Sequence, residues 1–170
     1  MKRMTTIFII VCTALVYGQW TPIESGVSDN LYGTYFLDDD TGFAVGWGAS
    51  SGAVALKTTN GGEDWNSTIL SNNAYVFSVT FTDSDHGYAA GCLNAGSSGA
   101  VFKTSNGGSN WSYSSFPATY GMYDVEFTSS QIGYTCGWLG KIYKTVNGGT
   151  NWTNVNSGTT NVLRWMSAVD

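Results

Sequence analysis

The stretch KTVNGGTNW, residues 144–152, is one of three nearly identical nine-residue segments in this chain. The other two are KTTNGGEDW at 57–65 and KTSNGGSNW at 103–111. Asn tolerates left-handed backbone angles, and Gly-Gly permits the positive φ that a tight hairpin needs. Each segment therefore predicts a turn between two β-strands. The closing Trp is large and flat, and suits packing between neighbouring sheets.

The tryptophans mark a repeat that spans most of the chain. Trp20, Trp65, Trp111 and Trp152 follow one another at intervals of 45, 46 and 41 residues. A glycine lies 26 residues after each of the first three, and a lysine lies 8 residues before each of the last three. Variation in repeat length is confined to the loops between that glycine and the next lysine, at 47–53, 92–100 and 138–140.

Each repeat divides into four short strands. The first alternates apolar and other residues with a period of two, as in Phe77, Val79 and Phe81, and a polar turn such as DSDHG separates it from the second. Units of about 40–50 residues with four antiparallel strands are typical of propeller blades. The sequence therefore predicts an all-β chain, a β-propeller of four-stranded antiparallel blades, with blades at about 31–70, 75–116 and 121–157.

The array is expected to be incomplete. Trp20 begins like a fourth strand with no partners before it, and residues 161–170 match the first strand of another blade. Three blades and two lone strands do not close a ring, since propellers take about four to eight blades. We expect a partial propeller over residues 19–170, a fragment of a larger exported protein; a naturally short open array is the alternative.

The N-terminus has the pattern of a secretory signal. Lys2 and Arg3 precede an apolar run from Ile7 to Val16, which is too short to span a bilayer. Residues 1–18 are therefore predicted to be a signal peptide cut before Gln19, with no membrane span after its removal. The expected location is the periplasm, the cell surface or the medium of a bacterium.

Charge narrows the classes of partner. The whole chain carries 7 basic and 12 acidic side chains, for a net charge of −5. Loss of Lys2 and Arg3 leaves 5 basic against 12 acidic side chains, a net charge of −7. Nucleic acid and anionic membrane surfaces are therefore not expected as partners.

The pattern T-x-N-x-G-x-x-W resembles the Asp-box, or bacterial neuraminidase repeat, with Asn in place of the usual Asp. The longer pattern F-x-D-x-x-x-G-(aromatic)-A-x-G … K-T-x-N-G-G-x-x-W resembles the repeats of the photosystem II stability and assembly factor family and its secreted bacterial relatives. That resemblance implies a propeller in which the box is structural and lies away from the usual ligand face. The box residues are Thr58, Asn60, Gly62, Trp65, Thr104, Asn106, Gly108, Trp111, Thr145, Asn147, Gly149 and Trp152.

An enzyme is the less favoured interpretation. A sialidase needs an arginine triad, and Arg164 is the single arginine after the predicted signal. Asp124 and Glu126 are two residues apart on a predicted first strand, where a carboxyl pair could serve a glycosidase, but no other blade repeats them. The alternative that stays open is a glycoside-active, sialidase-like propeller whose catalytic residues lie in further blades.

No metal or cofactor is expected. Asp38-Asp39-Asp40 and Asp83-x-Asp85 are oxygen-rich, but Asp is ordinary at turns and the spacing is not that of an EF-hand. His86 is the single histidine, which removes the usual basis of a zinc site.

Binding is the favoured function. Trp47 and Trp138 open two of the variable loops, and Tyr75 and Tyr120 lie in the links between blades, on the edge opposite the boxes. Aromatic side chains there can stack on sugars or grip a peptide, or else cover the blade edges as core. The sequence predicts a non-catalytic scaffold or interaction module with a protein or glycan partner.

Overall fold

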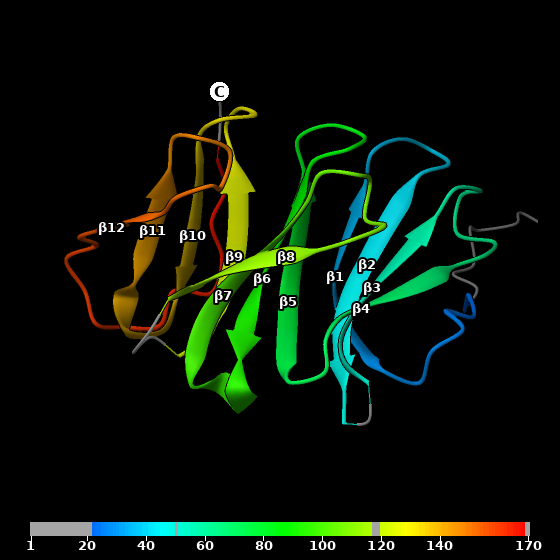
Figure 1. The fold of residues 1–170 in the computed structure, drawn as a ribbon, viewed down its shortest axis with the longest axis horizontal. Helices are drawn as coiled ribbons and strands as arrows, with labels where there is room; N and C mark the ends of the chain where they lie inside the picture. The colour runs from blue at the N-terminus through cyan, green and yellow to red at the C-terminus, as the bar shows by residue number, and fades with distance from the viewer. Residues whose placement is uncertain (1–21, 50, 117–119, 169–170) are drawn as a thin grey trace, which may run out of the picture.

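The chain folds into three four-stranded antiparallel sheets that stand side by side (Figure 1). The computed structural model describes residues 22–49, 51–116 and 120–168. The predicted signal peptide and the strand expected at Trp20 lie outside these residues. The all-β class and the four-stranded antiparallel blades that the sequence predicts are confirmed.

Each sheet pairs its strands in chain order, as in a propeller blade. The first sheet contains β1 (Asn30–Phe36), β2 (Gly42–Gly48), β3 (Gly52–Thr58) and β4 (Asn66–Ser71). The second contains β5 (Ala74–Phe81), β6 (Gly87–Leu93), β7 (Ser98–Thr104) and β8 (Ser112–Phe116). The third contains β9 (Met122–Phe127), β10 (Gly133–Gly137), β11 (Ile142–Thr145) and β12 (Thr153–Val155). Two 3₁₀ turns, η1 (Asn94–Gly96) and η2 (Trp138–Gly140), lie in the variable loops.

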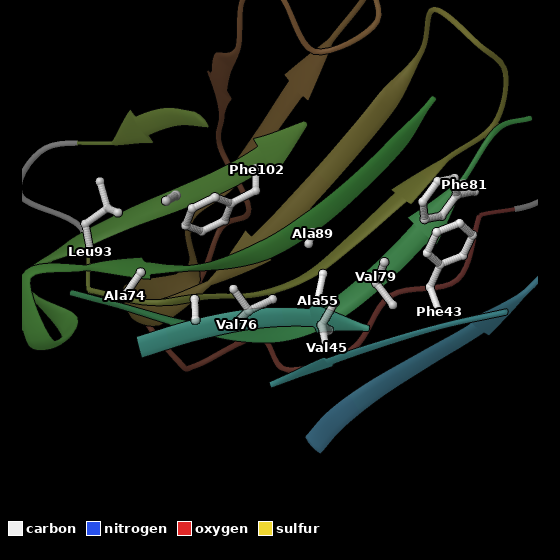
Figure 2. Packing of buried hydrophobic residues seen from close by; sticks show 12 residues of the cluster. Phe43, Val45, Ala55, Ala74, Val76, Val79, Phe81, Ala89, Leu93 and Phe102 are labelled. Atoms are coloured by element: carbon white, nitrogen blue, oxygen red, sulfur yellow. The ribbon is translucent and has the colours of Figure 1, made fainter. Parts of the chain in front are cut away.

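Apolar side chains between the sheets form the core. The largest cluster joins β2 and β3 of the first sheet to strands β5 to β7 of the second (Figure 2). At one end of this cluster the rings of Phe43 and Phe81 stack with centroids 3.8 Å apart (Figure 2). The next pair of sheets repeats the contact with Tyr88 and Phe127, also at 3.8 Å. Burial of each such ring contributes about 2–3 kcal/mol, so adjacent blades stabilise one another.

The first strand of each blade lies beside the first strand of the next, so β1, β5 and β9 are neighbours. Residues 156–168 follow β12 without forming a strand. They cross back to the third sheet, where Leu163 N donates to Gly137 O at 3.0 Å and Met166 N donates to a carboxylate oxygen of Asp124 at 2.8 Å (Figure 1). This segment therefore lies next to β9, where the sequence places the first strand of a further blade, but it makes isolated hydrogen bonds rather than a ladder.

Candidate functional site

The boxes are closed hydrogen-bond networks. In the second blade Thr104 Oγ1 accepts from the backbone N–H of Gly108 at 3.0 Å and donates to Asn106 Oδ1 at 3.0 Å. Asn106 Oδ1 also accepts from the N–H of Asn110 at 2.9 Å. The other two boxes repeat these bonds with Thr58, Asn60, Gly62 and Asp64, and with Thr145, Asn147, Gly149 and Asn151. The polar groups at the centre of each turn thus bond to one another.

The box tryptophans belong to the core. Each packs edge-on against the last residue of its blade's first strand, with centroids 6.1–6.2 Å apart, in the pairs Phe36–Trp65, Phe81–Trp111 and Phe127–Trp152. Trp152 also meets Phe116 of the preceding blade edge-on at 6.2 Å. These partly buried rings therefore contribute to packing within and between the blades.

The second and third boxes also contact the preceding blade. Lys103 Nζ donates to Gly148 O at 2.6 Å, and Tyr88 Oη donates to the same carbonyl at 3.0 Å. Lys57 Nζ makes the equivalent bond to Gly107 O at 3.0 Å. A Cβ on Gly149 would lie 2.8 Å from the Tyr88 ring, so the second box glycine is needed for close packing as well as for its positive φ of 76°. In the first two blades the lysine of the segment, Lys57 or Lys103, thus contacts the next blade.

Aspartates in the acidic turns accept hydrogen bonds from backbone N–H groups of the same turn. One carboxylate oxygen of Asp83 accepts from the N–H groups of Asp85 and His86, both at 2.8 Å, and Asp38 does the same for Asp40 and Thr41. These bonds lower the pKa of both carboxyls. Across residues 22–49, 51–116 and 120–168, no three His, Cys, Asp or Glu side chains gather as they would around a metal ion.

The Asp124 carboxylate is buried and already bonded to backbone. Its Oδ1 accepts from the N–H of Val125 at 3.1 Å, and its Oδ2 accepts from Met166 N. Glu126 is half-buried, and burial together with the charge of Asp124 raises the pKa of its carboxyl. One member of this carboxyl pair, Asp124, therefore holds the C-terminal segment in place through its bond to Met166 N.

A β-bulge recurs at one place in the first strand of every blade. The register shifts between Leu31 and Gly33 in β1, between Val76 and Ser78 in β5, and opposite Cys136 and Gly137 in β9. The residue left unpaired at each bulge is aromatic: Tyr32, Phe77 and Tyr123. A bulge re-aims one side chain of a strand, so the repeat directs one aromatic ring per blade out of the ladder.

The three bulge residues form a continuous row across the sheets. The ring centroids of Tyr32 and Phe77 are 5.9 Å apart, and those of Phe77 and Tyr123 are 5.1 Å apart. Together with Arg164 and Trp165 they line a hollow of about 190 Å³. We call Tyr32, Phe77, Tyr123 and Arg164 the aromatic row.

Arg164 extends this row at its C-terminal end. Its guanidinium carbon lies 5.1 Å from the centroid of the Tyr123 ring, within the range of a cation–π contact. The side chain is exposed, and the ion pairs of the described residues do not include it. The neighbouring Trp165 is the most exposed of the large apolar residues, at 77%.

The four residues proposed from sequence as ligand-binding all adjoin the row. Tyr75, Tyr120 and Trp138 line a second hollow of about 330 Å³ together with Phe77 and Tyr123. Trp138 Nε1 donates to Tyr123 Oη, which ties the two hollows together. Trp47 differs, because its ring lies between Tyr32 and Tyr75, with centroids 6.3 and 4.2 Å away, and its indole N–H is buried without a partner among the described residues. Trp47 therefore packs between the rings of Tyr32 and Tyr75.

Sequence reasoning missed the row itself. It placed Phe77 and Tyr123 in regular strands, where alternation would send them to the same face as Val79 and Val125. The overlooked signal is the glycine 26 residues after each Trp: a Cβ on Gly46, Gly91 or Gly137 would collide with the backbone carbonyl of Asn30, Tyr75 or Gly121 at the bulge. Those three glycines mark where the first strand bulges.

In the part of the chain described here, no helix has the length and apolar character needed to cross a membrane. The chain matches no protein-family model and no curated protein.

Two solved structures are similar to it. The structure of YCF48 bound to D1 peptide matches with a TM-score of 0.71 and 22% identity, over 88% of this chain and 46% of that one. YCF48 from Cyanidioschyzon merolae matches with a TM-score of 0.60 and 23% identity, over 77% of this chain and 41% of that one. The chain thus spans less than half of either neighbour's length. Over most of its own length, and at low sequence identity, it has the fold of part of the β-propeller of YCF48, a photosystem II assembly factor, as the repeat pattern predicts.

Proposed function

We propose that this chain is part of a non-catalytic propeller that binds a polypeptide segment at the aromatic row and the adjoining hollow. The observation that carries the proposal is the recurrence of one outward aromatic residue per blade at a β-bulge. A bulge with a matching glycine is retained in all three blades, although a regular strand would need neither.

The surface has the character of a peptide site. Tyr32 and Tyr120 are 49% and 55% exposed, and both hollows are lined mainly by rings with hydroxyl or indole groups at their edges. Rigid aromatic side chains give large contact area at low entropic cost, and their polar edges can meet peptide groups. One neighbour in fold is a YCF48 structure with a bound D1 peptide, which agrees with a peptide-binding role for this architecture.

The enzyme alternative has less support in these residues. Asp124 is bonded to backbone N–H groups, and the hollows contain no carboxyl group in their lining. We also propose export by the N-terminal signal, followed by action at the cell surface, in the periplasm or outside the cell; residues 1–18 lie outside the described part.

The test is selection from a random 12-residue peptide library displayed on phage, against the whole chain and against a Tyr32→Ala/Tyr120→Ala variant. Both side chains are about half exposed, so the variant should keep its fold and its melting temperature. Enriched peptides that bind the wild-type chain and lose at least tenfold in affinity on the variant support the proposal. Peptides that bind both equally, or no enrichment, overturn it.

A glycan partner is the outcome to distinguish. Titration with cellohexaose and chitohexaose, followed by tryptophan fluorescence, covers that class because sugar faces stack on the same rings. Saturable quenching by an oligosaccharide that the double variant loses, without any enriched peptide, would replace the peptide proposal with a glycan-binding one.

A further inference from the structure

All four residues of the aromatic row occupy the same position in the repeat. Tyr32, Phe77, Tyr123 and Arg164 each stand twelve residues after a repeat tryptophan, namely Trp20, Trp65, Trp111 and Trp152. The row thus consists of the residues at one position of four successive repeats, and the fourth of these residues is a cation. We propose that this position determines ligand specificity, one residue per blade, and that here it selects an extended peptide in which a carboxylate follows apolar side chains. This inference rests on the proposed function and names the ligand of the same site.

The row is slightly shorter than one face of a seven-residue extended peptide. Successive members are 5.9, 5.1 and 5.1 Å apart, measured between ring centroids and, for the last step, to the guanidinium carbon. Alternate side chains of an extended strand point the same way about 6.6 Å apart. Three such steps span about 20 Å, against a summed 16.1 Å along the row, and long side chains at the two ends of the peptide can cover the difference of about 2 Å at each end. Side chains i, i+2, i+4 and i+6 of one peptide face can then each reach one member of the row.

Arg164 supplies the charge selection. Its guanidinium carbon lies 5.1 Å from the centroid of the Tyr123 ring, and no carboxylate of the described residues forms an ion pair with it, so its N–H donors are available to a ligand. A planar guanidinium presents paired donors to a carboxylate. Chain-wide charge is negative, so this selection is local rather than a general attraction for acidic ligands.

The backbone on both sides of Arg164 is fixed. Leu163 N bonds to Gly137 O, and Met166 N bonds to the buried Asp124 carboxylate. These two bonds attach the backbone around Arg164 to the third sheet, at the end of the row. Asp124 is in this sense a positioning residue for Arg164.

The test uses three acetylated and amidated peptides with a fluorescent label. The first has the sequence Gly-Leu-Ser-Leu-Ser-Leu-Ser-Glu-Gly, and the other two carry Gln or Lys in place of Glu. Their order-reversed versions are included because either chain direction can follow the row. The wild-type chain should bind the Glu peptide about fivefold more tightly than the Gln peptide, as expected for a partly exposed ion pair. The difference should shrink in 0.5 M salt because screening weakens exposed charge pairs.

Substitutions at Arg164 then test whether this side chain recognises the charge of the peptide. Arg164→Gln should bind the Glu and Gln peptides equally, and Arg164→Glu should bind the Lys peptide more tightly than the Glu peptide. The matched control is Lys144→Gln, which removes one positive charge at the box edge of the same blade and should leave the preference for Glu unchanged. Unaltered melting temperatures show that the variants remain folded.

The outcomes separate this inference from the proposed function. If the peptides bind equally, and Tyr32→Ala/Tyr120→Ala weakens all of them alike, the row binds peptides but Arg164 does not select a carboxylate. If none of the three binds the wild-type chain, this ligand class is wrong, and the library selection alone decides whether the site binds peptides. A preference that survives Arg164→Glu would equally overturn the inference.

Discussion

The backbone carbonyl of Tyr75 occupies the space that a Cβ on Gly91 would need. The two residues face each other across the bulge of β5, where Val76 pairs with Gly91 and Phe77 is left out of the ladder. The same relationship joins Asn30 to Gly46 and Gly121 to Gly137. Glycine in the second strand and the displaced aromatic in the first strand are therefore two parts of one structural device.

Gly91→Ala should be strongly destabilising. The new methyl group would meet backbone atoms, which cannot move aside as a flexible side chain can, and we expect a loss of about 3 kcal/mol or more in the free energy of unfolding. Urea denaturation measures it. The control is Gly96→Ala, where the Cβ meets open space and only the positive φ of 97° is unfavourable, at about 1–2 kcal/mol. Equal losses for both variants would show that crowding at the bulge is unimportant.

Thr104→Val should destabilise the second blade although it preserves shape. Thr104 is 1% exposed, and its hydroxyl accepts from Gly108 N–H and donates to Asn106. Removal of a buried acceptor leaves that N–H without a partner and costs about 1–3 kcal/mol. Thr82→Val is the matched control, because the Thr82 hydroxyl makes only a long, exposed bond of 3.4 Å to His86 O. Thermal melts that fall equally for both variants would argue against a structural role of the box.

Lys103→Met should weaken the contact between the second and third blades. Its ammonium and the Tyr88 hydroxyl donate to the same carbonyl, that of Gly148. We expect each of Lys103→Met and Tyr88→Phe to cost about 1–2 kcal/mol. The double variant should cost more than their sum, because either donor alone still satisfies the buried Gly148 carbonyl and only the loss of both leaves it without a partner. Urea titrations of the four proteins complete the cycle.

Lys144→Met is the internal control for that cycle. Lys144 holds the same repeat position and lies over the Tyr134 ring at 5.4 Å, but in the part of the chain described here it bonds to no box carbonyl. Its loss should cost less than that of Lys103. An equal cost would mean that the lysine acts through its own blade rather than through the next one.

Glu126→Gln should stabilise the protein at neutral pH. Burial and then the charge of Asp124 raise the pKa of the Glu126 carboxyl above its ordinary value of 4.5. The folded state therefore holds this proton more tightly than the unfolded state, and stability falls as pH rises from the unfolded pKa through the folded pKa. Calorimetry should give Glu126→Gln a higher melting temperature than the wild-type chain at pH 7. Below about pH 4 the variant should have no advantage, because the protonated Glu126 side chain is then neutral, as Gln is.

The control for that change is Glu63→Gln, which removes one negative charge from an exposed box loop. Its melting temperature should stay close to that of the wild-type chain at both pH values. A stabilisation as large as that of Glu126→Gln would point to net charge rather than to local burial.

The blade architecture could be predicted from the sequence, because blade formation depends on local chemistry that is repeated three times. The Asn-Gly-Gly turns, the alternation in Phe77, Val79 and Phe81, and the constant distance from Gly91 back to Trp65 each specify one strand or turn without reference to the rest. The same local logic placed Tyr75, Tyr120 and Trp138 at the edge opposite the boxes, where they line one hollow.

The aromatic row, in contrast, depends on tertiary structure. Period-two alternation assumes a regular ladder, and a bulge breaks that assumption by shifting Tyr32, Phe77 and Tyr123 out of phase. Packing between blades then brought these three rings into contact and placed Arg164, more than 40 residues after Tyr123 in sequence, over the last of them. Local pattern cannot report such contacts, because they arise from the distance between sheets rather than from the order of residues within one.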